Sequence, residues 1–468
     1  MLLYKKQKKM KWLEVMELDR PFAAELRKHT RLYEGLFEHA RKLAIYPENR
    51  ETMELSRFFV EKTSDLLEEL IIHANFNPAD DHSPARSDVP TRELNDSAAG
   101  PGLLTSTLFA HMLPFDACTP FKNLNSLRLH RTNLRYCADT WCKFVDFTRI
   151  EYLRLFHCTG ADTLLGQLSR ASCLPRKLCV LELQHRDNTE NETLLALDGF
   201  LCLVSGLEDL VLDLQCVKSL PGAAGIARHG KTLELLSIHG SNDSINTLSG
   251  ENSDAEELIY DTESFDKICK ATTRLQQLSC AWPDRSLIRT PSDDWCAFEA
   301  ASAGLRDLVT LQITTWPSNK PSTQLLPRSV YEQLLQGLAT RLFEGFAKRT
   351  VRDPIPSSPA PSPSSETTSA APSLLAPSKF RLLAFGISEK IYEREDSKHQ
   401  LLYLRSTALD AEGKNKIYAA PIGWCLRQFV EPRSEILDSA LGREARVPCR
   451  GERADEGRFG SFDVDDDV

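Results

Sequence analysis

The sequence predicts an α/β solenoid in which short parallel strands alternate with helices. An apolar-x-x-Leu-x-apolar pattern recurs along the chain, as in Ile150, Leu153 and Leu155. Alternating apolar residues of this kind form a strand with one buried face. Five consecutive copies lie 26 to 29 residues apart, with central leucines at Leu127, Leu153, Leu181, Leu210 and Leu236. One strand per period of about 20–29 residues is typical of a leucine-rich repeat.

Less regular copies extend the pattern to about ten units. Their central residues are Leu43, Leu70, Leu278, Leu311 and Leu383. The stretches between strands, such as 163–172 and 191–204, carry apolar residues that indicate helices. A strand with its helix cannot bury its apolar face alone, so neighbouring units stack. We therefore expect a horseshoe-shaped leucine-rich repeat solenoid with irregular repeats and disordered inserts.

Composition divides the chain into five regions. The segment 354–378 consists mostly of Pro, Ser, Ala and Thr, which bury too little apolar surface to fold. The regions we expect are a helical N-terminal region or cap with a first loose repeat (1–62), the repeat solenoid with disordered loops near 78–102 and 240–256 (63–350), a Pro/Ser-rich disordered insert (351–379), the last repeat with a C-terminal cap (380–440), and a disordered charged tail (441–468).

Charge and cysteine content narrow the class of protein. The formal net charge of −9 argues against a general nucleic-acid binder, which normally has a basic surface. The opening residues are too short for a signal peptide, and no apolar run is long enough to cross a bilayer. Thirteen cysteines without a C-x-x-C pair fit a reducing compartment. We expect an intracellular protein, cytoplasmic or nuclear, that binds neither membrane nor nucleic acid.

Cys158 stands next to His157, and such a pair could be a nucleophile with its base or half of a metal site. The repeat gives another interpretation, because Cys158 falls where the chain turns after a strand. A structural role is therefore favoured over catalysis or metal binding.

The segment GIARHGKT (225–232) matches a phosphate-binding P-loop, with Lys231 and Thr232 in the functional positions. A P-loop follows a strand and begins a helix. Here a helical stretch comes first and the strand-like LELLSI follows, so the context argues against the match. Since the Ser/His/Asp, H-E-x-x-H and dinucleotide patterns are also missing, we predict a protein that is not an enzyme and uses no cofactor or metal. A P-loop nucleotide hydrolase is the rival hypothesis.

Strand alternation assigns one set of side chains to the concave face of the solenoid. This face is either a solvated polar surface or a surface that binds a partner, with a basic edge at 128–154 and an acidic patch at 182–213. The candidate binding residues are Arg128, His130, Arg154, Phe156, Glu182, Gln184, Asp213 and His239.

The repeat segments IARHGKTLELLSIHG (226–240) and SKFRLLAFGIS (378–388) resemble the repeat region of fungal F-box/leucine-rich-repeat proteins. The resemblance implies a substrate receptor of a cullin-RING ubiquitin ligase, with a ligase adaptor and a protein substrate as partners and no small-molecule substrate. An F-box opens with Leu-Pro and amphipathic helices, which residues 1–60 do not contain. We interpret the similar stretch at 325–343 as the helical side of a repeat. The F-box is then diverged, truncated or absent, and a stand-alone scaffold is the alternative.

Overall fold

The computed structural model describes twelve stretches of the chain. The predicted loop 78–102, most of the insert 351–379 and the tail 441–468 lie outside them. The described residues are 41–47, 50–74, 108–109, 121–135, 137–187, 190–242, 256–317, 328–352, 378–386, 400–409, 411–427 and 429–432.

The described residues form an α/β protein built on one open sheet of 13 strands, most of them parallel. The strand order follows the sequence, with one exception. Strand β8 (Glu256–Glu257) pairs antiparallel with the last two residues of β7. Each new strand therefore adds beside the previous one, as stacked units require. The parallel strands are β1 (Lys42–Ile45), β2 (Glu69–His73), β3 (Ser126–His130), β4 (Tyr152–Phe156), β5 (Val180–Arg186), β6 (Asp209–Gln215), β7 (Leu235–Asn242), β9 (Gln277–Cys280), β10 (Thr310–Ile313) and β11 (Leu382–Phe385).

The register of the sheet confirms the predicted alignment of the units. All ten central leucines pair side by side in a single row, from Leu43 in β1 to Leu383 in β11. Every one of them is buried in the main core. A shift of one residue would turn these side chains to the other face, so the leucine row fixes the register of the whole sheet.

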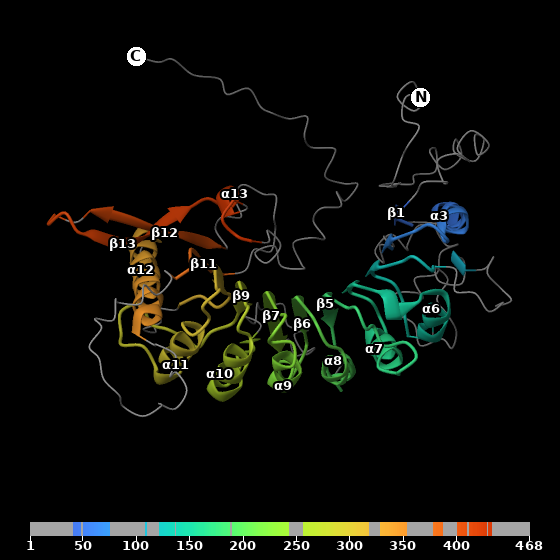
Figure 1. Ribbon diagram of the computed structural model, residues 1–468, viewed down its shortest axis with the longest axis horizontal. Coiled ribbons are helices and arrows are strands. Elements are labelled where there is room, and N and C mark those ends of the chain that lie inside the picture. The colour runs from blue at the N-terminus through green and yellow to red at the C-terminus, as the bar shows by residue number, and fades with distance from the viewer. Residues whose placement is uncertain are drawn as a thin grey trace, which may run out of the picture.

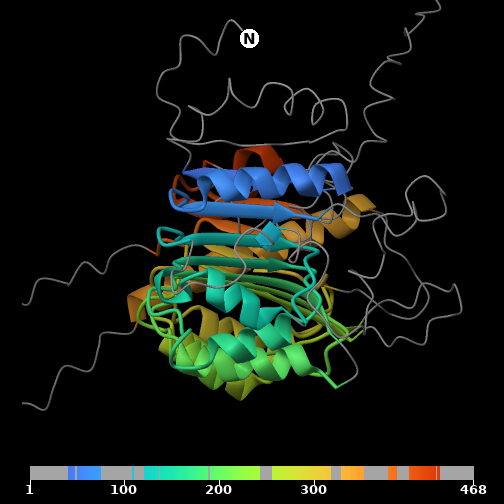
Figure 2. The same ribbon diagram turned by 90° about the vertical axis from the view of Figure 1, so that its right-hand side faces the viewer.

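Helices return the chain from one strand to the next along one side of the sheet. Figures 1 and 2 show a curved sheet with α7 to α11 on its convex side. The core lies between the leucine row and these helices, with Phe265 stacked on Phe298 at 4.0 Å between ring centres. The helices on this side are α6 (Ala138–Phe144), η4 (Phe147–Arg149), α7 (Ala161–Leu168), α8 (Glu192–Leu203), α9 (Ala223–Ala227), α10 (Thr262–Ala271) and α11 (Asp293–Ser302).

The two ends of the sheet are built differently. At the first edge, α3 (Arg50–Thr63) connects β1 to β2. At the last edge, the antiparallel strands β12 (Leu401–Leu409) and β13 (Asn415–Ile422) follow β11, and the short helix α13 (Trp424–Arg427) comes next. The long helix α12 (Arg328–Arg352) packs on this hairpin. Its Gln336 side chain donates to the Ala419 carbonyl, and Ala419 N–H donates to the Thr340 hydroxyl.

Some boundaries differ from the sequence prediction. Residues 42–45 form strand β1, which is the first loose repeat expected around Leu43. At the predicted insertion 240–256, strand β7 continues to Asn242, and Glu256 already belongs to β8. The stretch predicted at 325–343 is helical from Arg328 on, and this helix continues to Arg352 and packs on the C-terminal hairpin. Within the part of the chain that the structure describes, no helix has the length and apolarity needed to cross a membrane.

Candidate functional site

The eight predicted binding residues lie together on the concave face in two neighbouring rows. The first row is Arg128, Arg154 and Glu182, which pair in register on β3, β4 and β5. The second row lies two residues further along the strands. It contains His130, Phe156, Gln184, Asp213 and His239. Paired positions on neighbouring strands are about 5 Å apart, so each row is a continuous line of adjacent side chains.

An ion pair joins the predicted basic edge to the predicted acidic patch. Arg154 Nε donates to Glu182 Oε1 at 2.9 Å, and the Glu182 side chain is only 2% exposed. The Arg154 guanidinium also lies 5.8 Å from the centre of the Tyr152 ring. Charges paired this closely neutralise each other at the border, so the two halves of the face are less distinct than their sequence suggests.

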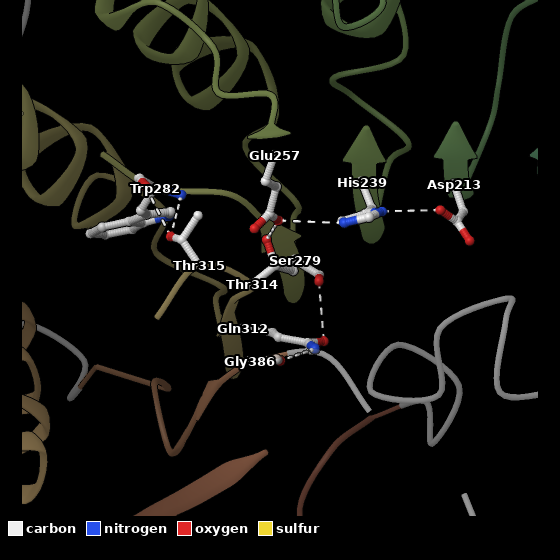
Figure 3. A network of polar contacts seen from close by, with 9 residues as sticks. All are labelled: Asp213, His239, Glu257, Ser279, Trp282, Gln312, Thr314, Thr315 and Gly386. Carbon is white, nitrogen blue, oxygen red and sulfur yellow. Dashed lines mark hydrogen bonds and ion pairs between the residues drawn. The ribbon is translucent and has the colours of Figure 1, made fainter. Parts of the chain in front are cut away.

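A chain of polar contacts runs along the second row, and Figure 3 shows the part from Asp213 to Glu257. Gln184 Nε2 donates to Asp213 Oδ2, and Asp213 Oδ1 lies 3.0 Å from His239 Nδ1. His239 Nε2 lies 3.7 Å from Glu257 Oε1, so the imidazole stands between two carboxylates. The Thr314 hydroxyl donates to Glu257. Burial raises the pKa of Glu257, while the neighbouring His239 lowers it.

This arrangement places the His239 imidazole between two carboxylates. In a catalytic triad one imidazole nitrogen faces a carboxylate and the other faces a hydroxyl or thiol. Here the second nitrogen of His239 faces Glu257. Among the described residues, no group of three or more His, Cys, Asp or Glu side chains could hold a metal ion. The contacts of His239 therefore link strands β6, β7 and β8 on the concave face.

Sequence reasoning missed Glu257 and Thr314. Thr314 directly follows the last apolar residue of β10, as His239 follows Ile238, so the repeat pattern could have found it. Glu257 belongs to β8, beside the predicted polar insertion, where no periodicity marks it. Only the pairing of β8 with β7 brings its carboxylate to His239.

The remaining positions of the second row are aromatic and apolar. The centres of the His73 and His130 rings are 3.8 Å apart, and the centres of the His130 and Phe156 rings are 6.4 Å apart. Phe156 belongs to a second apolar cluster, which we call the concave apolar patch. Ile422 of β13 and Val430, which follows α13, pack against it. The patch consists of Phe156, Val211, Leu235, Leu382, Ala384 and Leu402.

Cys158 and His157 have structural roles. The Cys158 thiol is buried and donates to the Leu129 carbonyl of the preceding unit at 3.4 Å. Burial raises its pKa to about 12, so the thiolate needed for nucleophilic attack is scarce. His157 has a positive φ of 50° and forms the turn after β4. Its backbone N–H donates to the Gln184 backbone carbonyl.

The P-loop-like segment has the order of elements that argues against phosphate binding. Helix α9 precedes Lys231, and β7 follows it. The Thr232 hydroxyl donates to the Leu207 carbonyl at 2.7 Å and also lies 3.1 Å from the His229 carbonyl oxygen, so it is engaged inside the protein. A Cβ on Gly230 would lie 2.2 Å from the Ala271 carbonyl oxygen, which explains the glycine by close packing with α10.

No protein-family model matches this chain, and a comparison with curated proteins finds none that is significantly similar. The arguments for function therefore rest on the curved sheet, its register and the side chains of the concave face.

Proposed function

We propose that this chain is a leucine-rich repeat protein that recognises a protein partner through its concave face. The observation that carries the proposal is the row of ten in-register leucines, each from one strand of a stacked unit. Repeat proteins of this kind contact only their neighbours and offer an extended curved surface, which is their usual binding surface. A binding role needs no catalytic group.

The chemistry of the concave face also supports recognition of a protein. It combines an apolar patch around Phe156 with aromatic rings, an ion pair and a line of hydrogen-bonding groups. Protein interfaces similarly combine an apolar and aromatic centre with polar groups that fix the orientation. The Gln184 side chain is fully buried, and its Oε1 has no hydrogen-bond donor among the described residues.

We further propose that the partner is a substrate of a cullin-RING ubiquitin ligase. This step rests on the resemblance of segments 226–240 and 378–388 to F-box/leucine-rich-repeat proteins. In that arrangement, the repeats hold the substrate and a separate segment binds the ligase adaptor. The protein itself carries out no reaction and uses no cofactor.

Affinity capture from the protein's own cells, followed by mass spectrometry, tests both steps. Three full-length baits are compared: wild type, Arg128→Glu on the concave face, and Lys267→Glu, which is exposed on α10. We expect wild type and the control to capture the same partner and the ligase adaptor. Arg128→Glu should lose the partner and keep the adaptor.

Two other results would change the proposal. If a partner appears without the adaptor, the chain is a stand-alone binding protein and the ubiquitin step is wrong. If Arg128→Glu captures the same proteins as the control, the concave face does not select them and a scaffold role is the better description. Circular dichroism of the three baits checks that each is folded.

A further inference from the structure

Strand β8 has only two residues, and the side chain of Glu257 adds to its attachment to the sheet. Its backbone pairs with the last two residues of β7, and the Leu258 N–H donates to the Gly240 carbonyl. Glu257 faces His239 of β7 and accepts a hydrogen bond from the Thr314 hydroxyl, which follows β10. A strand this short gains little from backbone pairing alone. The contacts of Glu257 therefore contribute a large part of what holds β8 in place.

Both carboxylates that face His239 receive a donor from its ring only when each ring nitrogen carries a proton. Figure 3 shows this ring between Asp213 and Glu257. Asp213 Oδ1 lies 3.0 Å from Nδ1, and Glu257 Oε1 lies 3.7 Å from Nε2. A neutral imidazole donates from one nitrogen and accepts at the other. With both carboxylates ionised, the accepting nitrogen would face a carboxylate oxygen, whereas an imidazolium presents a positively charged N–H group to each carboxylate.

The surroundings favour the protonated ring. The side chains of Asp213 and Glu257 are 4% and 18% exposed, so water screens their charges only in part. Burial raises the pKa of Glu257, while His239 and the Thr314 hydroxyl lower it by favouring the carboxylate. Glu257 also acts on the Cys280 thiol of β9, whose pKa is raised to about 12, chiefly by burial. This thiol therefore stays neutral near neutral pH and adds no charge to the cluster.

We propose that Asp213, His239 and Glu257 form a pH-sensitive clasp, closed by a proton on His239, that holds β8 on the concave face and loosens as the pH rises above neutral. In the closed clasp, the imidazolium links β6, β7 and β8 through two opposite charges. In the open clasp the three groups titrate separately, and a free histidine loses its proton at about pH 6.5. Above that pH, opening releases a proton, so the free energy of opening decreases as the pH rises. The clasp lies within this chain and needs no partner, so its test is independent of the proposed function.

Nuclear magnetic resonance of the full chain with nitrogen-15-labelled histidine measures the charge of the ring. His239→Gln assigns the resonances of His239 among the eleven histidines. We expect His239 to keep imidazolium shifts at pH values where a free histidine is neutral. Glu257→Gln should shift this titration to lower pH, because it removes one flanking charge. Glu263→Gln, the same substitution at an exposed position of α10, should leave it unchanged. If His239 titrates like a free histidine in all three proteins, it holds no additional proton and the proposal is wrong.

Hydrogen exchange of the same proteins shows whether the proton holds β8. Rates are corrected for the intrinsic effect of pH on exchange. Between about pH 6 and about pH 8, where histidine changes charge, protection of the Leu258 N–H should fall in wild type and in Glu263→Gln. Glu257→Gln should lose this pH dependence, because a glutamine amide can donate to the neutral imidazole. Parallel profiles in all three proteins would overturn the clasp whatever the charge of His239, since β8 would then be held by its other contacts. Circular dichroism checks that each variant is folded.

Discussion

At the scale of single residues, the reactivity of Cys158 follows from its burial. Its thiol lies in the turn after β4 and its pKa is raised to about 12. We expect iodoacetamide at about pH 8, where an ordinary thiol is partly ionised, to label the exposed Cys202 and Cys296 and to spare Cys158. Peptide mass spectrometry before and after denaturation measures this difference. Labelling of Cys158 in the native protein as fast as of Cys202 would show that the turn is open.

Glu431 gives the molecule a dependence on pH of defined sign. The residue is 7% exposed, its carboxyl has no hydrogen-bond partner among the described residues, and burial raises its pKa to about 8 despite the opposing charge of Arg427. In the unfolded chain the group loses its proton near 4.5. Between these values unfolding releases a proton, so the free energy of unfolding should decrease as the pH rises through this window.

Urea denaturation across that pH window measures the effect. Glu431→Gln is the matched control, because it keeps the size of the side chain and cannot titrate. The variant should lose the part of the pH dependence that lies between the two values. If wild type and Glu431→Gln have parallel profiles, the carboxyl is not protonated in the native protein.

At the scale of elements, the turn that begins α7 requires a glycine. Gly160 has a φ of +78°, and a Cβ there would lie 2.3 Å from backbone atoms of Arg135. Gly160→Ala should therefore lower the free energy of unfolding by on the order of 3 kcal/mol, from strain and overlap together.

Gly166, inside the same helix, is the control. A Cβ there meets nothing within 4 Å. Gly166→Ala should raise the stability by roughly 0.5–1 kcal/mol, because alanine is the better helix former. Chemical denaturation of both variants measures the contrast. Equal effects would mean that the close contact of Gly160 with Arg135 does not exist in solution.

The accuracy of the sequence prediction differs between strands and their surroundings for a physical reason. Alternation with period two fixes the position of a strand and also which side chains face out, so Leu153 and Leu155 located β4 and placed Arg154 on the concave face. The antiparallel pairing of β12 with β13 was not foreseen. Whether neighbouring strands run parallel or antiparallel depends on the connection between them, and the apolar pattern alone does not encode that connection.

The candidate site shows the same division. The eight predicted residues come from neighbouring units, and the repeat itself puts them side by side. Glu257 and Val430 reach the same face from β8 and from the segment after α13. Glu257 lies outside the repeat pattern, and Val430 lies far along the chain from the central repeats. No local periodicity could therefore predict their contacts.

At the scale of the whole molecule, the segment that contains α13 and Val430 returns to the concave face and covers part of it. Val430 packs against the concave apolar patch, which also includes Phe156 and Val211 from the middle of the sheet. The segment and a protein partner would therefore compete for the same surface. Repeat units contact only their neighbours, so a segment after the last strand that packs on the concave face is an addition to the repeat architecture.

Val430→Asp should detach this segment, because a charged group is costly to bury against apolar side chains. We expect stronger binding of a hydrophobic fluorescent dye and faster hydrogen exchange of residues 424–432. Leu426→Asp is the control, since Leu426 is about half exposed in the same segment and lies outside the patch. Detachment should also increase capture of a partner that uses Phe156. If Val430→Asp and Leu426→Asp give the same dye binding and exchange, the segment does not cover the patch in solution and the face is open to partners at all times.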